Sequence, residues 1–249
     1  DTPVDRFFSL FTNPWVPIIS VFLYLALSDL IFEFIRDTFK IKPKGFGMQT
    51  ITVLHSLALA VYSGWTFINC IQIAYETYIA RGSIYGTICD PSLDLWDTRG
   101  FGFWVTHFYI SKYYEFIDTW IVILKGRKPM FLQTFHHAGV VLISWGFIVT
   151  KNSGAGIVLV TFNSFIHTLM YTYYVFAAFG FNSPLKKFLT QAQILQFLIG
   201  GGLLVPTFWM DNCVNPAQAL TTKAIHVYLL ALVYLFTMFY IKSYTRKTK

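Results

Sequence analysis

Residues 155–179 read AGIVLVTFNSFIHTLMYTYYVFAAF, a stretch that contains no Asp, Glu, Lys or Arg. About 20 mostly apolar residues are enough for a helix to cross the hydrocarbon core of a bilayer. The stretch nevertheless contains Asn163, His167, Tyr171 and Tyr174, and their spacing places them on one stripe of a helix. It therefore predicts a membrane-spanning helix with one hydrogen-bonding face.

Similar apolar stretches flank this one, and no charge-rich or Pro/Ser-rich linker divides the chain. Of the 249 residues, 55% are hydrophobic and 12% are charged, whereas a soluble domain has about 25% charged residues. The sequence predicts an all-α integral membrane protein with a single domain, residues 1–249, in which seven transmembrane helices form one bundle around a narrow tunnel. The predicted spans are 14–35, 48–75, 101–124, 130–150, 155–179, 188–209 and 220–241.

Basic residues indicate the orientation, because cytosolic loops are enriched in Lys and Arg. They favour a lumenal N-terminus and a cytosolic C-terminus. Despite the net charge of +7, they form no basic face, so we expect no nucleic-acid partner. The predicted cytosolic group is Arg36, Lys40, Lys42, Lys44, Lys125, Arg127, Lys128, Lys186, Lys187, Lys242, Arg246, Lys247 and Lys249, and the lumenal group is Arg6, Arg81, Arg99, Lys151 and Lys223.

The chain has three cysteines, none in a CxxC pair, so a zinc or thioredoxin-type site is not expected. The predicted topology places Cys89 and Cys213 in lumenal loops, where an oxidising compartment allows disulfides to persist. We predict that these two cysteines pair; the alternative is two unrelated free thiols. Cys70 is interpreted as a small buried apolar residue.

Ionisable side chains inside a membrane helix cost about 2.5–3.5 kcal/mol each at its centre, so they need an explanation. In the third predicted span, Lys112, Glu115 and Thr119 share one helical face, with Asp118 on its flank. In the fourth span, Gln133 precedes His136 and His137 by about one turn. Structural alternatives stay open: an ion pair that only fixes packing, and a polar packing pair of histidines.

Thr190, Gln193 and Gln196 add a polar face to the sixth predicted span. Four predicted helices thus carry polar residues at a similar depth, nearer the cytosolic side, while their lumenal halves are largely apolar. A water-accessible chamber open to the cytosol would satisfy these groups. A polar mouth above an apolar tunnel suits a ligand with a polar head and a long hydrocarbon tail.

At these residues the chain resembles the very-long-chain fatty acid elongases over nearly its whole length. Lys112–Thr119 matches their KxxExxDT motif, Asn163–Tyr174 matches NxxxHxxMYxYY, and Thr190–Phe197 matches TxxQxxQF. Their histidine box usually reads HxxHH, whereas Gln133 stands at its first position here. This QxxHH form is similar to that of elongases acting on polyunsaturated acyl chains.

The resemblance implies a 3-oxoacyl-CoA synthase of the endoplasmic reticulum membrane. Such an enzyme condenses malonyl-CoA with a long-chain acyl-CoA and releases carbon dioxide and CoA. The QxxHH form favours a polyunsaturated chain, but the sequence does not fix the unsaturation. It implies no cofactor and no metal. The implied partners are the two CoA substrates, the lipid bilayer, and the ketoacyl reductase, dehydratase and enoyl reductase of the elongation cycle. The acyl chain length and the oligomeric state do not follow from the sequence.

The resemblance also implies residue roles. His136 would carry the acyl group as an acyl-imidazole, and His167 would contact the malonyl unit. The residues themselves favour a histidine nucleophile, because no cysteine lies in the predicted cytosolic half and imidazole is a neutral nucleophile near pH 7. The predicted catalytic residues are His136, His137, His167 and Gln133. The predicted substrate-binding residues are Lys112, Glu115, Asp118, Asn163, Tyr171, Tyr174, Gln193, Gln196, Lys125, Arg127, Lys128, Lys186 and Lys187; the last five, suited to CoA phosphates, could equally be topology signals alone.

Two other classes deserve comparison. Di-iron membrane desaturases and hydroxylases also have histidine boxes, but they use several, and this chain has 6 histidines in all. His55, His107 and His226 stand alone and are interpreted as packed or interfacial residues. A seven-helix receptor or transporter fits the topology, but a cytosolic chamber does not suit an extracellular ligand, and no internal repeat is evident.

Overall fold

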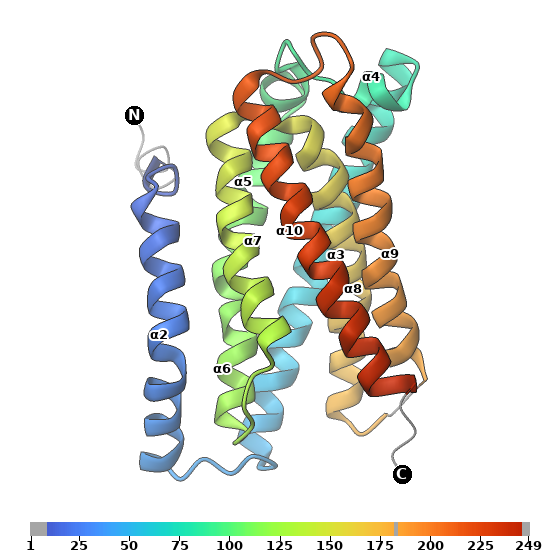
Figure 1. The fold of residues 1–249 in the computed structure, drawn as a ribbon. Coiled ribbons are helices and arrows are strands. Elements are labelled where there is room, and N and C mark those ends of the chain that lie inside the picture. The colour runs from blue at the N-terminus through green and yellow to red at the C-terminus, as the bar shows by residue number, and fades with distance from the viewer. Residues whose placement is uncertain (1–8, 182–183, 246–249) are drawn as a thin grey trace.

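The computed structural model describes residues 9–181 and 184–245, and these residues form helices joined by short loops (Figure 1). Apolar stretches become helices because a bilayer offers the backbone no hydrogen-bond partners. The elements are α2 (Trp15–Thr38), α3 (Phe46–Arg81), α4 (Ile84–Ile88), η1 (Asp94–Thr98), α5 (Phe101–Tyr114), α6 (Phe116–Leu124), α7 (Phe131–Thr150), α8 (Ser153–Ala178), α9 (Leu185–Leu204), η2 (Val205–Phe208), α10 (Pro216–Tyr240) and η3 (Ile241–Thr245).

Six of the described helices are long and apolar enough to cross a membrane: α2, α3, α7, α8, α9 with η2, and α10 with η3. The all-α membrane fold is therefore confirmed. The predicted third span, 101–124, is divided into α5 and α6, which meet at Glu115. At this junction the Asp118 N–H donates to the Glu115 carbonyl at 3.1 Å, a tighter turn than the α-helical one. The count of seven spans and the tunnel stay predictions.

One helix is longer than the sequence indicated. The prediction ended the second span at Tyr75, before Glu76 and Arg81, yet α3 continues to Arg81. The helix can extend because the Arg81 guanidinium binds Asp90 and Asp94 beyond its end, at 2.9 and 3.0 Å. Glu76 therefore lies within the helix, and Arg81 is its last residue, bound to carboxylates just beyond the helix end.

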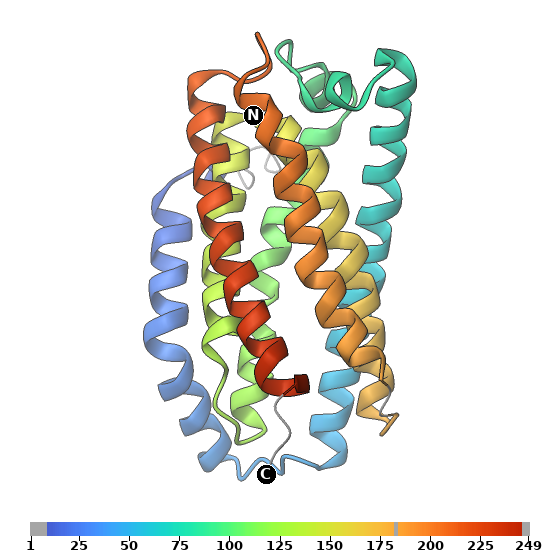
Figure 2. The ribbon, with the colours of Figure 1, turned by 45° about the vertical axis from the view of Figure 1, so that its right-hand side comes forward.

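The helices form a ring in which α3, α8, α9, α10, α7 and α5 follow one another, with α5 closing against α3 and α8. The helix α2 lies outside this ring, against α6 and α7, in both views (Figures 1 and 2). Three hydrogen bonds attach it to α6: Tyr24 to Thr119 at 2.8 Å, the Trp120 indole to Ser28 at 3.0 Å, and the Arg36 guanidinium to the Ile123 carbonyl at 3.4 Å.

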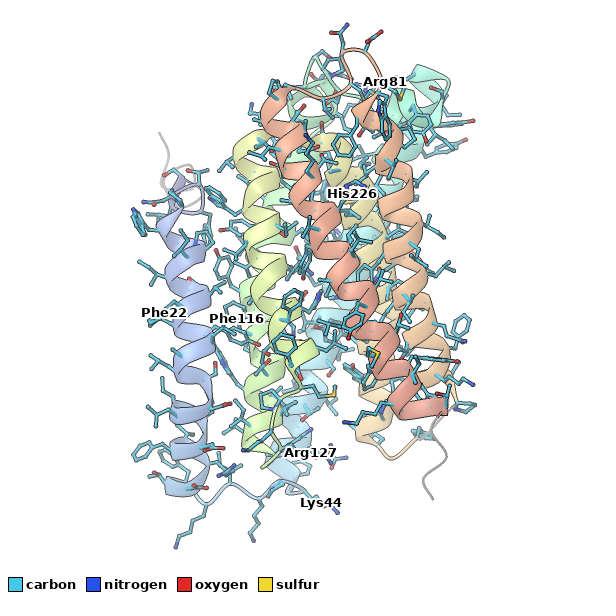
Figure 3. All side chains as sticks on the ribbon, in the orientation of Figure 1. Phe22, Lys44, Arg81, Phe116, Arg127 and His226 are labelled. Carbon is cyan, nitrogen blue, oxygen red and sulfur yellow. A yellow bond between two sulfur atoms is a disulfide. The ribbon has the colours of Figure 1, made fainter. Side chains whose placement is uncertain are left out.

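The loops of one end of the bundle contain most of the basic residues. Lys44 and Arg127 lie at this end, whereas Arg81 lies at the opposite end (Figure 3). The loops α2–α3 and α6–α7 and the start of α9 share the first end (Figure 1). The separation agrees with the predicted two groups, although which end faces the cytosol stays a prediction. Arg6, Arg246, Lys247 and Lys249 lie outside the described residues.

A covalent link holds the other end together. The structure contains the predicted disulfide between Cys89, which follows α4, and Cys213, which precedes α10; 124 residues separate them in the chain. The Arg81 guanidinium also donates to the Cys89 carbonyl at 2.9 Å. The last turn of α3, the loop after α4 and the loop before α10 are thus fixed to one another, and Cys70 is buried and free, as predicted.

Replacing Cys213 by Ser should lower the thermal unfolding midpoint of the purified protein in detergent micelles. A disulfide that closes a long loop contributes about 2–4 kcal/mol. Reductant should lower the midpoint of the unchanged protein to a similar extent and leave the Cys213→Ser variant unaffected. Equal midpoints for the two proteins without reductant would contradict a stabilising disulfide.

Candidate active site

The centre of the site is an ion pair at the junction of α5 and α6. The Lys112 Nζ donates to Glu115 Oε1 at 2.6 Å, and each side chain is 2% exposed. The same ammonium donates to Asn163 Oδ1 on α8 at 3.0 Å and lies 4.0 Å from the centre of the Phe108 ring. Burial of either charge alone would be costly, so each residue makes the other tolerable at this depth.

The ion pair determines the protonation of His167. Because Lys112 is only a donor, Asn163 must present its carbonyl oxygen to Lys112 and its amide nitrogen to His167. The Asn163 Nδ2 lies 3.2 Å from His167 Nε2, so Nε2 accepts and the ring proton resides on Nδ1. That Nδ1 lies 3.5 Å from Glu115 Oε1. In this tautomer the Nδ1–H faces the Glu115 carboxylate, without a hydrogen bond to it among the described residues.

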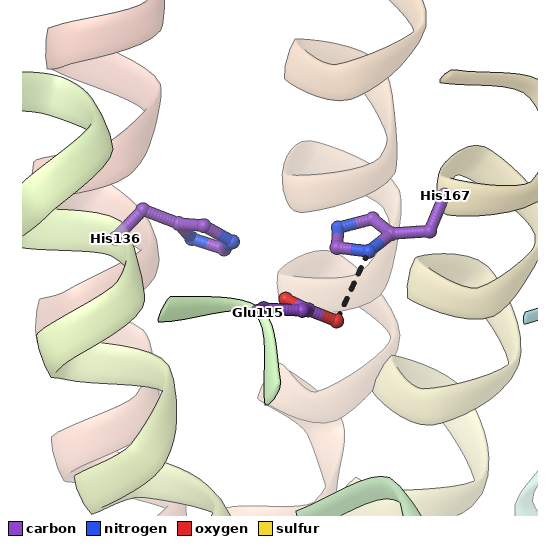
Figure 4. A group of neighbouring side chains, drawn as sticks. All are labelled: Glu115, His136 and His167. Carbon is purple, nitrogen blue, oxygen red and sulfur yellow. Dashed lines mark ion pairs between the residues drawn. The ribbon is translucent and has the colours of Figure 1, made fainter. Parts of the chain in front are cut away.

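His136 completes the cluster from the opposite wall. His136 lies near the N-terminal end of α7, and its ring points toward Glu115 and His167 (Figure 4). The ring centres of His136 and His167 are 6.3 Å apart, and one ligand atom from each of Glu115, His136 and His167 lies within 4.8 Å of the others. The two imidazoles predicted to meet across the chamber do meet, while their catalytic roles stay predictions.

The same three side chains have the composition of a metal site, and the charge beside them argues against one. Lys112 is hydrogen-bonded to the carboxylate that would bind the ion, and its ammonium would repel a cation at close range. Within residues 9–181 and 184–245, this is the one group of His, Cys, Asp and Glu with such spacing. Three ligands do not suffice for the di-iron alternative.

Gln133 and His137 flank the cluster. The Gln133 Nε2 donates to Thr119 Oγ1 at 3.3 Å, and Thr119 in turn bonds Tyr24 of α2. His137 is buried, with Nδ1 4.0 Å from Glu115 Oε2. His137 thus lies beside the ion pair and Gln133 beside Thr119, while their catalytic roles stay predictions. Neither Nδ1 of His137 nor Oε2 of Glu115 has a hydrogen-bond partner among the described residues.

Asp118 and Tyr171 form a second polar contact. Asp118 accepts from Tyr171 at 2.6 Å through Oδ2, and its Oδ1 lies 2.9 Å from His55 Nε2. Both carboxylate oxygens are therefore engaged with α3 and α8, which indicates a structural role for this predicted substrate-binding residue. His55 was interpreted as a packed histidine, and it is buried; its partner Asp118 lies 63 residues away, which no local pattern indicates.

Other predicted residues are more scattered. Tyr174, expected on the inward wall, is 40% exposed and packs edge-on against Tyr171. Helix α8 continues toward the bundle end there, so its stripe leaves the packed interior. Gln193 donates to the Met170 sulfur at 3.3 Å. The predicted phosphate-binding residues lie at the ends of helices or in loops, away from the histidines: Lys125, Arg127, Lys128, Lys186 and Lys187.

A narrow cavity extends from the histidine cluster. Its polar end is formed by His136, Asn163 and Gln196, and the rest runs between α7, α8, α9 and α10. Gln196 Oε1 is buried without a hydrogen-bond partner among the described residues. The apolar lining comprises Phe108, Val140, Ile143, Phe147, Leu159, Phe162, Phe197, Ile225, Leu229 and Leu232. Polar and apolar parts are therefore continuous, as a ligand with a head and a tail requires.

Sequence reasoning missed Tyr228 of α10. Its hydroxyl lies 2.9 Å from the His136 carbonyl and 3.2 Å from His136 Nδ1. The seventh predicted span has no motif, and nothing in the sequence sets Tyr228 apart from Tyr234 and Tyr240 of the same span.

Comparison with known proteins agrees with this geometry. The model of a family described as ELO: GNS1/SUR4 matches residues 9–249. The chain belongs to the ELO family. It is 31% identical to the fatty acid elongase sre1 of Dictyostelium discoideum, over 83% of this chain and 76% of the relative.

Two vertebrate relatives show the same similarity. The chain is 34% identical to the very long chain fatty acid elongase 6 of Mus musculus, over 84% of this chain and 78% of the relative. It is 32% identical to the protein of the same name from Gallus gallus, over 83% of this chain and 78% of the relative. The resemblance to elongases is thereby confirmed. The link between the QxxHH form and polyunsaturated chains stays a prediction.

Replacing Lys112 by Met should destabilise the protein by about 3–5 kcal/mol, because it leaves the Glu115 carboxylate buried without its partner. The double variant Lys112→Met, Glu115→Gln removes both charges and should recover much of this loss. Thermal unfolding in detergent micelles measures both effects. As a control, Lys151→Met breaks an exposed pair with Asp97 and should cost less than about 1 kcal/mol. Equal losses in the single and double variants would contradict the proposed charge compensation.

Proposed function

We propose that this ELO family protein is a membrane acyltransferase, a 3-oxoacyl-CoA synthase that joins malonyl-CoA to a long-chain acyl-CoA. The observation that supports this best is the cluster of His136, His167 and Glu115 at the polar end of an apolar cavity. The cavity suits a hydrocarbon tail, and the cluster lies where the thioester carbonyl of that tail would be held. The proposed location is the endoplasmic reticulum membrane, with a lumenal N-terminus and a cytosolic C-terminus.

The first half-reaction transfers the acyl group to the protein. A His136 nitrogen attacks the thioester carbonyl, the C–N bond forms and the C–S bond breaks. CoA leaves as a thiolate that takes a proton from solvent, and His136 keeps the proton on its other ring nitrogen as an acyl-imidazolium. Negative charge develops on the carbonyl oxygen during the attack, and hydrogen-bond donors placed there stabilise it. Gln196, beside His136 in the cavity wall, has an amide group suited to this task.

The second half-reaction forms the new carbon–carbon bond. Malonyl-CoA loses carbon dioxide, and the electrons of the broken bond form a thioester enolate. The enolate carbon attacks the acyl group of the acyl-imidazolium, the C–N bond breaks with its electrons passing to the ring nitrogen, and 3-oxoacyl-CoA and neutral His136 result. The Lys112 ammonium is the fixed positive charge nearest to His167, linked to it through Asn163. This charge favours an enolate bound against His167.

The remaining proposed interactions lie outside the cluster. Lys125, Arg127, Lys128, Lys186 and Lys187 are proposed to bind the phosphates of the two CoA molecules, because they share one end of the bundle. The 3-oxoacyl-CoA product would pass to the reductase, dehydratase and second reductase of the elongation cycle. A polyunsaturated acyl chain is the proposed substrate class on account of Gln133.

Replacing His136 by Ala should abolish condensation, since the acyl group then has no nitrogen to bind. The assay measures incorporation from radiolabelled malonyl-CoA into 3-oxoacyl-CoA by purified protein in detergent. His107→Ala is the control, because His107 lies on α5 outside the cluster and packs on Phe103; it should retain activity.

Peptide mass spectrometry after incubation with acyl-CoA alone should locate the acyl group on His136. An unchanged condensation rate in His136→Ala would remove His136 from the nucleophile's role. An acyl group found only on His167 would reverse the two assignments.

Replacing Phe147 by Ala should shift the product distribution toward longer acyl chains. Phe147 lines the cavity 11 residues after His136 on α7, about 16 Å along the helix axis. Removal of its ring lengthens the space available to the tail. Product analysis with acyl-CoAs of increasing length measures the shift, and Val149→Ala, an exposed position on the same helix, is the control. An unchanged distribution would show that Phe147 does not limit chain length.

A further inference from the structure

The contact between Tyr228 and His136 indicates which ring nitrogen of His136 is protonated. The Tyr228 hydroxyl lies 2.9 Å from the backbone carbonyl oxygen of His136 and 3.2 Å from its Nδ1. A carbonyl oxygen can only accept, so the single hydroxyl proton is donated to it. The hydroxyl oxygen then remains as an acceptor, and Nδ1 of His136 must carry the proton that it receives. Nε2 is left with the lone pair.

The direction of the ring makes this tautomer significant. The His136 ring points toward Glu115 and His167, which lie across the chamber (Figure 4). With Nδ1 bound to Tyr228, Nε2 is the nitrogen free to face the reacting carbonyl. In a neutral imidazole only the nitrogen without a proton is nucleophilic. If the proton resided on Nε2, the nitrogen that faces the chamber would have no lone pair with which to attack.

A glycine permits this contact. The Tyr228 ring packs directly on Gly139 of α7, and a Cβ at residue 139 would lie 2.3 Å from Tyr228 Cε2. No side chain could occupy that position without displacing the aromatic ring. Gly139 follows His136 by one helical turn, so the glycine that admits the ring also lies directly beside the imidazole that the hydroxyl holds.

We propose that Tyr228 is a positioning residue that fixes the Nδ1–H tautomer of His136, and that Gly139 provides the space for it. The proposal rests on the proposed role of His136 as nucleophile. Tyr228 does not touch the reacting atoms; it determines which nitrogen is available to them.

The decisive experiment is nitrogen NMR of protein labelled with ¹⁵N-histidine in detergent micelles. The ¹⁵N chemical shift distinguishes a protonated from an unprotonated imidazole nitrogen, and the His136→Asn variant identifies the His136 signals. In the unchanged protein, His136 should show a protonated Nδ1 and a bare Nε2. In Tyr228→Phe, which keeps the ring and loses the hydroxyl, the signals should move toward a mixture of tautomers.

Kinetics give a second readout. Tyr228→Phe should lower kcat about tenfold, as expected for the loss of one hydrogen bond of ordinary strength. The KM values for acyl-CoA and malonyl-CoA should stay within about twofold, because Phe keeps the ring with which Tyr228 lines the cavity. Tyr234→Phe, at an exposed position on the same helix, should change neither kcat nor the His136 signals.

Gly139→Ala tests the same contact from the other side and covers the case of a Tyr228 variant that does not fold. It should displace the Tyr228 ring and reproduce both effects. Gly146→Ala is the matched control on the same face of α7, where the added Cβ meets only Thr221 Cγ2 at 3.1 Å; it should be nearly silent.

A tautomer unchanged in both Tyr228→Phe and Gly139→Ala would overturn the proposal, whatever happens to the rate. Condensation by His136→Ala would instead refute the acyl-histidine mechanism, and the tautomer measurement would still report separately on the contact with Tyr228.

Discussion

The buried pair of Lys112 and Glu115 is the interaction on which the rest of the site depends. Two opposite charges one helical turn apart lie at a depth where neither could remain alone. The helix tightens at Glu115, where the Asp118 N–H bonds the Glu115 carbonyl, and the Lys112 ammonium fixes the amide orientation of Asn163. Through that amide the pair sets the proton of His167. The same ion pair therefore stabilises the buried charges and fixes the proton of His167.

Around this pair, a layer of polar contacts joins helices that are distant in sequence. Asp118 joins α6 to α3 and α8 through His55 and Tyr171. Thr119 joins α6 to α2, and Tyr228 joins α10 to α7. In an apolar medium such bonds are contacts that only one arrangement of helices satisfies, so they specify how the helices are placed. The reacting groups proposed above belong to this layer, which gives them little freedom to move.

Local patterns account for most of what the sequence predicts correctly. Runs of apolar residues identify helices because the backbone must bond internally in lipid, and helical spacing brings Asn163 and His167 onto one face. The break at Glu115 was not predictable, because residues 101–124 have no proline at the junction and the turn is set by partners on α8 and α7. Tyr228 and Gly139 were missed for a related reason: their contact exists only once α10 and α7 pack together. Exposure of Tyr174 likewise depends on how far α8 projects beyond its neighbours.

The disulfide between Cys89 and Cys213 bears on the order in which the two proposed CoA substrates bind. It closes one end of the helical ring, and Cys70, the third cysteine, is buried and unpaired, so covalent bonds restrain that end alone. We expect any separation of the helices to occur at the opposite, basic end, where no disulfide joins the described residues. In the proposed reaction, acyl-CoA and malonyl-CoA would then use the same opening. The first CoA would have to leave before the second thioester could bind. The acyl-histidine mechanism proposed above would then follow a ping-pong order, with the acyl group held on the protein between the departure of the first CoA and the binding of the second.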